Sequence, residues 1–338
     1  MAIKSQLFPA VALFLTALAA TPRSYSQSAY KYIRIGNPAD ATTSTSPGYA
    51  LMGGGSDLDE AFQWLCGKAP GGDFLVLRAA GDDDYNDYVN KLCHANSVGT
   101  LIIPSREAAA DPKVSEIIHQ AETVFLAGGD QARYMNWWQH SPVQDALNAH
   151  IAAGKPIGGT SAGLAVLGEY VYSAQGDAPD DDGLTSKQAL ANPYFSRVTV
   201  RRDFLEIPLL RNTLTDSHFA KRDRMGRTLV FLARIVQDGW SPQPREIAID
   251  EKSAVLIEAD GDARVIGSGK GAYFLSVQAP PRTCAEGEPL TFRDVAVYHG
   301  PSGSEFDVKS WKPRTGAGYS LSVLAGDVQS SQPRHEIY

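Results

Sequence analysis

One serine has the small neighbours that a nucleophilic hydroxyl requires, in the run Gly159-Thr160-Ser161-Ala162-Gly163. A serine hydroxyl becomes an effective nucleophile only when a base takes its proton and a tight turn holds it in place. Glycines on both sides keep a sharp turn uncrowded, as in the nucleophile elbow between a strand and a helix. We therefore predict acyl-transfer chemistry by Ser161, with a purely structural turn as the alternative.

Two backbone N–H groups near this serine are candidates for an oxyanion hole. Residues 162–169 are predicted to form a helix, whose first N–H group, that of Ala162, faces the reacting centre. Gly128-Gly129 ends the preceding predicted strand, where the lack of a side chain lets the backbone approach a substrate. We assign Gly129 and Ala162 to this role, although a plain strand-to-helix turn would also explain the glycines.

The general base must be one of seven histidines. Six of them fall in or beside predicted helices or in the C-terminal strands: His94, His119, His140, His150, His299 and His335. The seventh, His218, is predicted to open a helix in the run Thr215-Asp216-Ser217-His218-Phe219. A lone histidine is usually structural, so spacing alone leaves the role of His218 open.

Charged residues follow His218 in two groups. The predicted helix carries a basic run of Lys221, Arg222, Arg224 and Arg227, which fits either a solvated face or a cationic wall that grips a carboxylate. An acid must also orient the histidine. Spacing does not choose among the candidates, which are Asp250, Glu251, Asp203, Glu206 and Asp216.

The elements that must position these residues alternate between short apolar strands and helices. The predicted strands are 73–78, 100–104, 123–127 and 155–159, and the predicted helices are 60–66, 85–95, 112–120 and 142–153. This alternation is typical of an α/β fold with a mostly parallel sheet and helices on both faces. Ligands bind beyond the carboxyl ends of such strands, where polar or glycine-rich loops follow Met52, Ala127 and Ile157.

The last third of the chain is richer in strands. Residues 246–258 and 263–267 are predicted to pair around an Asp260-Gly261 turn, and 290–298 and 319–324 add further strands. We predict a single catalytic domain over 29–338 that includes a C-terminal β extension from about 246 to 338.

The N-terminus is typical of a signal peptide. Lys4 precedes an apolar run, 11–20, that is too short to anchor the chain in a bilayer. We predict a signal peptide over 1–26 and a secreted protein, extracellular or periplasmic. Export would place the chain in an oxidising environment, and two arrangements of the cysteines stay open. Either Cys66 and Cys93 form a disulfide, or all three cysteines, including Cys284, are free buried thiols.

The composition excludes several other classes. The 338 residues are 43% hydrophobic and 20% charged, which is ordinary for a globular protein. A net charge of −7 argues against nonspecific binding to nucleic acid. No Cys/His cluster has the spacing of a zinc site. We expect no cofactor, no metal and no membrane contact of the mature form, and we leave a homodimer open.

Several of these motifs, taken in order, resemble the cyanophycinases, which group with dipeptidase E in one family of serine peptidases. The motifs are Gly53-Gly54-Gly55, Gly128-Gly129-Asp130-Gln131, the run around Ser161, Asp216-Ser217-His218-Phe219 with Arg222, Arg224 and Arg227, and Ile249-Asp250-Glu251. The resemblance extends from about residue 49 to about residue 275 and leaves the rest of the chain unmatched.

The resemblance implies a fold like the class I glutamine amidotransferases, with Ser161 as nucleophile, His218 as base and Glu251 as orienting acid. It implies substrate contacts from a set of polar residues, namely Gln131, Asp216, Ser217, Arg222, Arg224 and Arg227. It also implies an exopeptidase whose partner is an aspartyl peptide, as cyanophycinases release β-aspartyl-arginine dipeptides. Cyanophycinases typically carry glutamine before the histidine, whereas this chain has Ser217, so its substrate pocket must differ.

Two other functions stay open. An esterase of the α/β-hydrolase type also uses a Gly-x-Ser-x-Gly elbow, but that fold orders its triad as Ser, acid, His. A non-catalytic binding protein on the same scaffold would have lost Ser161, His218 or the acid, and this chain retains all three types.

Overall fold

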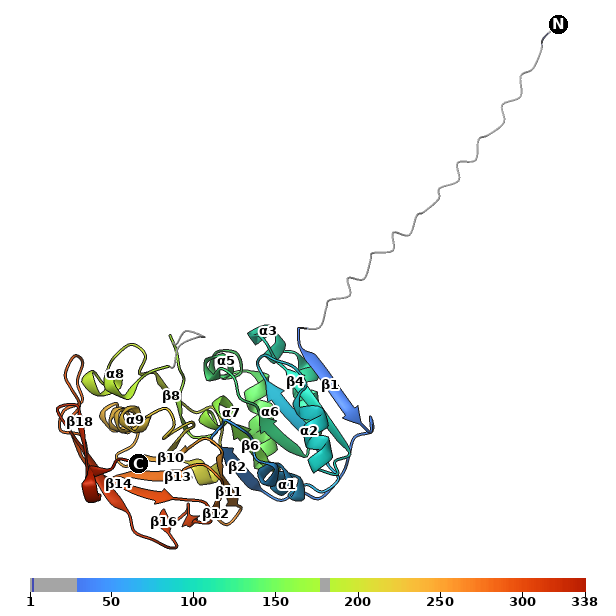
Figure 1. Ribbon diagram of the computed structural model, residues 1–338. Coiled ribbons are helices and arrows are strands. Elements are labelled where there is room, and N and C mark those ends of the chain that lie inside the picture. The colour runs from blue at the N-terminus through green and yellow to red at the C-terminus, as the bar shows by residue number, and fades with distance from the viewer. Residues whose placement is uncertain (1, 3–28, 177–182) are drawn as a thin grey trace.

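The computed structural model describes residue 2, residues 29–176 and residues 183–338, which form an α/β structure with two sheets (Figure 1). Apart from residue 2, the predicted signal peptide lies outside the described residues. No helix in the described part is long and apolar enough to cross a membrane.

The first sheet is ten-stranded, in the order β1-β4-β3-β5-β6-β2-β11-β12-β15-β16. In that order the strands are Lys31–Gly36, Ser97–Ile102, Asp73–Arg78, Thr123–Leu126, Ile157–Thr160, Gly48–Met52, Ser253–Glu258, Asp262–Gly267, Glu305–Asp307 and Lys312–Pro313. The central five strands, β4-β3-β5-β6-β2, are parallel. The strands that flank them on both sides pair antiparallel.

The second sheet is eight-stranded, in the order β18-β17-β14-β13-β10-β9-β7-β8. Its strands are Asp327–Ser330, Tyr319–Leu324, Phe292–Gly300, Ala272–Val277, Arg245–Ile249, Thr213–Asp216, Tyr170–Tyr172 and Val200–Arg202. β9 pairs parallel with β10 and with β7, and the remaining pairs are antiparallel.

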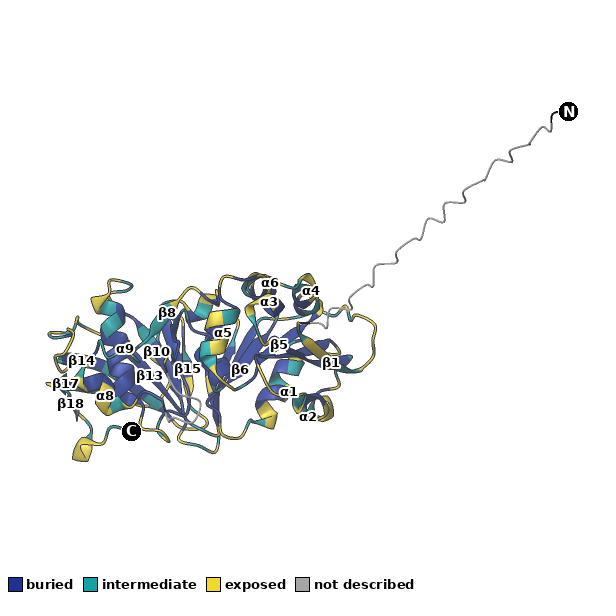
Figure 2. Ribbon diagram, turned by 90° about the horizontal axis from the view of Figure 1, so that it is seen from above, coloured by how far each residue is buried: buried dark blue, intermediate teal, exposed yellow. Residues whose placement is uncertain are grey.

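Helices cover both faces of the parallel strands, as predicted (Figure 2). Along β3, Leu75 and Leu77 join the core under α4 and α6, while Phe74 and Val76 join the core under α1 and α2. This alternation is the two-residue period of a strand buried on both sides. The helices are α1 Asp59–Gly67, α2 Tyr85–Leu92, α3 Arg106–Ala109, α4 Pro112–Gln120, α5 Gln131–Trp137, α6 Pro142–Ala152, α7 Ala162–Ala165, α8 Ser186–Ala191 and α9 Met225–Gln237, with 3-10 turns at Pro208–Leu210 and Pro333–His335.

The prediction of a mostly parallel sheet is wrong, because both sheets are mixed and largely antiparallel. The predicted strand over 246–258 is two strands, β10 and β11, which belong to different sheets. A turn at 250–252, in which Lys252 has φ +57°, separates them. The predicted C-terminal extension therefore supplies strands to both sheets, and most of them pair antiparallel.

The predicted helix opening at His218 is also wrong. Residues Thr213–Asp216 form β9, which is fully buried and pairs with β10, and α9 begins only at Met225. The intervening turn contains two residues with positive φ, His218 at +46° and Asp223 at +47°, which no α-helix accommodates. The helix predicted over 162–169 is likewise shorter and ends at Ala165.

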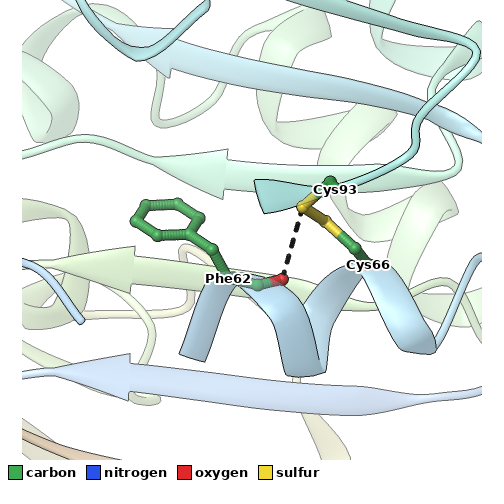
Figure 3. Close-up of a disulfide and its surroundings, with 3 residues drawn as sticks. All are labelled: Phe62, Cys66 and Cys93. Carbon is green, nitrogen blue, oxygen red and sulfur yellow. Dashed lines mark hydrogen bonds between the residues drawn. A yellow bond between two sulfur atoms is a disulfide. The ribbon is translucent and has the colours of Figure 1, made fainter. Parts of the chain in front are cut away.

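Cys66 and Cys93 form a disulfide with a Cα–Cα distance of 5.7 Å (Figure 3). The bond joins the end of α1 to the residue that follows α2, and the Cys93 sulfur lies 3.7 Å from the Phe62 carbonyl oxygen. Cys284 is a buried free thiol. Of the two cysteine arrangements considered from the sequence, the structure therefore has the paired one.

Candidate active site

Ser161 lies in a sharp turn between β6 and α7, with φ +51° and ψ −114°. Such a backbone is costly for a residue with a side chain and persists only where the surroundings enforce it. A Cβ atom on Gly163 would lie 1.9 Å from the Leu126 carbonyl oxygen, and one on Gly159 would lie 2.6 Å from the Gly163 carbonyl carbon. The flanking glycines are thus required by close backbone packing around the turn.

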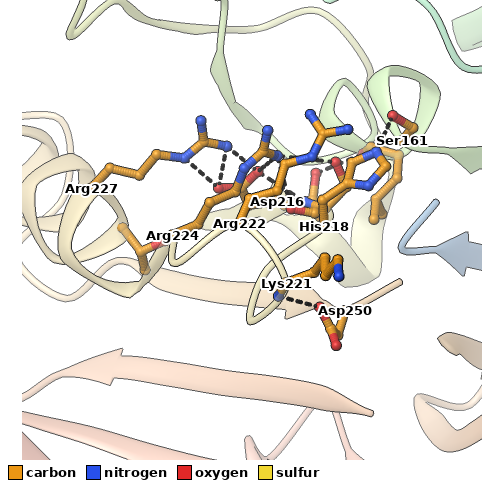
Figure 4. Close-up of polar contacts among 12 residues, drawn as sticks. Ser161, Asp216, His218, Lys221, Arg222, Arg224, Arg227 and Asp250 are labelled. Atoms are coloured by element: carbon orange, nitrogen blue, oxygen red, sulfur yellow. Dashed lines mark hydrogen bonds and ion pairs between the residues drawn. The ribbon is translucent and has the colours of Figure 1, made fainter. Parts of the chain in front are cut away.

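His218 follows β9 and points at Ser161 (Figure 4). Its Nε2 atom lies 2.8 Å from the Ser161 Oγ atom. Its backbone N–H group donates to the Gly53 carbonyl oxygen at 2.8 Å, which ties the histidine to the end of β2. The structure therefore brings the predicted nucleophile and base into hydrogen-bond contact.

Glu251 reaches the other side of the same imidazole from the turn between β10 and β11. Its Oε1 atom lies 2.7 Å from the His218 Nδ1 atom. Its neighbour Asp250 accepts instead from the Lys221 backbone N–H at 2.8 Å. Of the acids considered from the sequence, the structure brings Glu251 to His218.

Burial lowers the pKa of His218, and the nearby Arg222 and Arg224 lower it further, against the hydrogen bond to Glu251. The hydrogen bond to His218 in turn holds the pKa of Glu251 below its ordinary value. At neutral pH the imidazole is therefore neutral beside a carboxylate. Since a carboxylate only accepts, Nδ1 carries the proton and Nε2 accepts from the Ser161 hydroxyl.

The glycines after β2 line this hydrogen-bonded chain. Gly54 has φ +89°, and a Cβ atom there would lie 2.6 Å from His218 Nε2 and 3.2 Å from the Ser161 Cβ atom. A Cβ atom on Gly55 would lie 3.1 Å from the Glu251 Cβ atom. Sequence analysis singled out the Gly53-Gly54-Gly55 motif but assigned it no role. The fold shows that its backbone covers the Ser161–His218 contact.

The two predicted oxyanion donors lie on either side of Ser161. Gly129 has φ +150°, and a Cβ atom on Gly128 would lie 3.5 Å from the Ser161 Cβ atom, so this loop passes close to the serine. Ala162 is the first residue of α7. Within the described part of the chain, neither the Gly129 nor the Ala162 N–H group has a hydrogen-bond partner.

Four of the predicted substrate-binding residues contact one another in a buried network (Figure 4). Arg227 donates to both carboxylate oxygens of Asp216, at 2.6 to 3.0 Å, and only 1% of its side chain is exposed. Arg224 donates to Asp216 at 3.2 Å and to the Ser217 carbonyl oxygen at 2.8 Å. Burial raises the pKa of Asp216, but the attraction of Arg227 and Arg224 outweighs it and the pKa is lowered.

The other two predicted substrate-binding residues are accessible to solvent. Arg222 keeps 44% of its side chain exposed, with Nε 4.0 Å from the Glu251 Oε1 atom. Gln131 is partly exposed and begins α5, two residues after Gly129. Of the six predicted substrate-binding residues, Arg222 and Gln131 are therefore the ones that a ligand could reach, whereas Asp216 and Arg227 are buried and pair with each other.

Comparisons with known proteins agree with the motif-based resemblance. The model of peptidase family S51 matches residues 57–198, which include Ser161. The cyanophycinase of Nostoc sp. is 29% identical over 217 residues, which cover 63% of this chain and 65% of the relative. That of Synechococcus elongatus is 27% identical over 248 residues, which cover 69% and 70%. A solved peptidase from an acI-B1 Actinobacterium aligns with a TM-score of 0.49 and 16% identity, covering 78% of this chain and 98% of that one.

The chain therefore resembles the peptidases of family S51, as predicted. The relatives named above are cyanophycinases, and together with the family match they support the prediction of a serine peptidase. The match to the Nostoc relative spans 65% of that protein's length, a little under two thirds.

We predict that Gly54→Ala greatly slows the reaction of Ser161 with a fluorophosphonate probe. The added methyl would lie 2.6 Å from His218 Nε2 at a backbone φ of +89°, so the imidazole must move away from the hydroxyl. Labelling is followed by intact mass, with Gly67→Ala as the control, because nothing lies within 4 Å of a Cβ atom at that position. Wild-type labelling of a folded Gly54→Ala variant would contradict this account of the glycine.

We also predict that Ser161 labelling falls in acid with a midpoint below the ordinary pKa of histidine, because burial lowers the pKa of His218. Arg222→Ala should move that midpoint to higher pH, since the arginine cation disfavours the imidazolium. Lys113→Ala, which removes an exposed cation on α4, is the charge-matched control. A midpoint for Arg222→Ala at or below the wild-type value would refute the electrostatic assignment.

Proposed function

We propose that the protein is a serine-type exopeptidase that hydrolyses aspartyl peptides, with β-aspartyl-arginine peptides as the preferred class. The observation that carries the proposal is one continuous chain of hydrogen bonds. It runs from the Ser161 Oγ atom to His218 Nε2 at 2.8 Å and from His218 Nδ1 to Glu251 Oε1 at 2.7 Å.

In the proposed mechanism, His218 Nε2 takes the Ser161 proton while Oγ attacks the peptide carbonyl carbon. The Gly129 and Ala162 N–H groups hold the oxyanion of the tetrahedral intermediate. His218 then gives its proton to the leaving amine, which produces the acyl-enzyme. Water, deprotonated by His218, releases the acid product and restores the serine, while Glu251 stays ionised and stabilises the imidazolium.

The charge around the site supports an acidic substrate. Arg222 and Arg224 both lie near His218, and Asp216 is already paired with Arg227 and Arg224. Arg222 keeps 44% of its side chain exposed and approaches Glu251 only through Nε, at 4.0 Å, so its terminal nitrogens can pair with a substrate carboxylate, which guanidinium groups bind bidentately. The buried Ser217, whose Oγ lies 3.5 Å from Arg224, leaves more space than the glutamine typical of cyanophycinases, so we propose a related rather than identical peptide range.

We further propose a class I glutamine amidotransferase-like arrangement for the catalytic core. The support is the parallel order β4-β3-β5-β6-β2, with the candidate nucleophile in the turn directly after β6. The same turn would suit an α/β-hydrolase esterase, the alternative function. Here, however, the acid that contacts His218 follows it in the chain, which is not the order of that fold.

The test is a panel of β-aspartyl and α-aspartyl dipeptides, with and without arginine, beside a short-chain p-nitrophenyl ester. We expect β-Asp-Arg to be cleaved with the highest kcat/KM. Ser161→Ala should lower turnover by about a thousandfold or more without unfolding the protein.

Ser302→Ala, which removes an exposed hydroxyl, is the matched control and should retain wild-type rates. Preferred cleavage of the ester would favour the esterase. Failure of the folded wild-type protein to cleave any substrate or to react with a fluorophosphonate would favour a binding protein.

We propose that the protein is exported, and the Cys66–Cys93 disulfide supports this, since such bonds persist in oxidising compartments. Expression of the full chain should yield an extracellular or periplasmic product that has lost the predicted signal peptide, residues 1–26, and keeps the disulfide by intact mass. Leu15→Arg, which interrupts the apolar run, should prevent export. Retention of the uncleaved wild-type chain in the cytoplasm would contradict the proposal.

A further inference from the structure

Tyr338 contacts the segment that carries His218 and Arg222, although more than a hundred residues separate them. Its hydroxyl donates to the Asp223 Oδ1 atom at 2.9 Å and accepts from the Met225 backbone N–H at 2.9 Å. Its ring packs edge-on against Phe219, with centroids 5.9 Å apart. One side chain therefore contacts both ends of the segment 219–223, and it also caps the first turn of α9.

The peptide that ends in Tyr338 is itself held by the second sheet. The Tyr319 hydroxyl on β17 donates to the Ile337 carbonyl oxygen at 2.8 Å. The Tyr338 ring also packs against Tyr273 of β13, with centroids 5.9 Å apart at 86°. Figure 1 places the C-terminus beside α9 and the strands of this sheet. Tyr338 is therefore anchored to the second sheet on one side and contacts Asp223 and Met225 on the other, so it can restrict the motion of the segment between His218 and α9.

The segment requires such support because its backbone is strained. His218 and Asp223 both have positive φ, at +46° and +47°. The left-handed region is unfavourable for residues with a side chain, less so for Asp than for most, and such a conformation persists where neighbouring contacts enforce it. His218 is held by the Gly53 carbonyl oxygen, and Phe219 by that of Ile249. At Asp223, the carboxylate contact comes from the Tyr338 hydroxyl.

We propose that Tyr338 is a positioning residue that holds the segment 218–224 in the conformation that directs His218 at Ser161 and Arg222 toward the substrate. The part of this inference that concerns catalysis rests on the proposed function. Burial raises the pKa of Tyr338, with the Asp223 carboxylate adding to the effect, so the hydroxyl keeps its proton and remains a donor throughout the physiological range.

The test is Tyr338→Phe, which removes the hydroxyl and keeps the ring on Phe219. We expect hydrogen exchange in peptides covering 217–225 to become at least about fivefold faster. We expect kcat/KM for the best aspartyl peptide to fall about five- to tenfold, which corresponds to the net contribution of one typical hydrogen bond. Both kcat and KM should change, because the segment carries the base and the exposed arginine.

Tyr194→Phe is the matched control, since the Tyr194 hydroxyl donates to Asp238 at 3.0 Å at the other end of α9. It should leave exchange over 217–225 and kcat/KM within about twofold of wild type. Asp223→Ala should reproduce the effect of Tyr338→Phe, the two changes together should add little, and Asp223→Asn, which keeps an acceptor, should restore most of the activity.

Wild-type exchange and wild-type kcat/KM in Tyr338→Phe would overturn the inference. So would strictly additive effects of Tyr338→Phe and Asp223→Ala. If the wild-type protein cleaves no aspartyl peptide, the proposed function fails, but the exchange measurement still decides whether Tyr338 holds the segment.

Discussion

The site depends on His218 being held from three directions at once. Its backbone N–H bonds to Gly53 after β2, its Nδ1 to Glu251 in the β10–β11 turn, and its Nε2 to Ser161 after β6. β2, β6 and β11 belong to the first sheet, whereas β9 and β10 belong to the second. The candidate site therefore lies where the two sheets meet, and the turn at 250–252 connects a strand of one sheet to a strand of the other beside it.

The buried ion pair beneath His218 complements this arrangement. Asp216 is the last residue of β9 and accepts hydrogen bonds from Arg227, which lies in α9. This pair joins the strand and the helix on either side of the loop that carries His218. A buried carboxylate is tolerated only with such partners. Because Arg224 also contacts Asp216, the cluster carries more positive than negative charge. That excess lies next to the imidazole and contributes to its lowered pKa.

The sequence was most informative where a local pattern decides the structure. The strand 73–78 and the helix 112–120 were predicted at their observed limits, because an apolar run and an Asp111-Pro112 cap are local signals. The sharp turn at Ser161 followed from its glycines in the same way. The second sheet was missed because its pairings join distant segments, and β9 is four residues long with no alternation of burial.

The roles of adjacent acids and of neighbouring arginines were beyond sequence reasoning for a related cause. Asp250 and Glu251 are consecutive, and only the path of the turn sends one to Lys221 and the other to His218. Arg222 and Arg227 share one basic run, yet one is exposed and the other buried against Tyr172. Sequence analysis placed both arginines on one predicted helix and so gave them the same environment, because it did not predict the turn that precedes α9.

The crossing of the chain between the two sheets has a consequence for biosynthesis. A ribosome delivers β2 and β6 first, so the elbow with its serine can form while the histidine and its acid are still being made. The parallel strands alone hold no base near that hydroxyl, since His218 and Glu251 arrive with β9 and the turn after β10. A nascent or truncated chain that stops before residue 251 therefore lacks the complete hydrogen-bonded chain, which can form only after most of the polypeptide has been made.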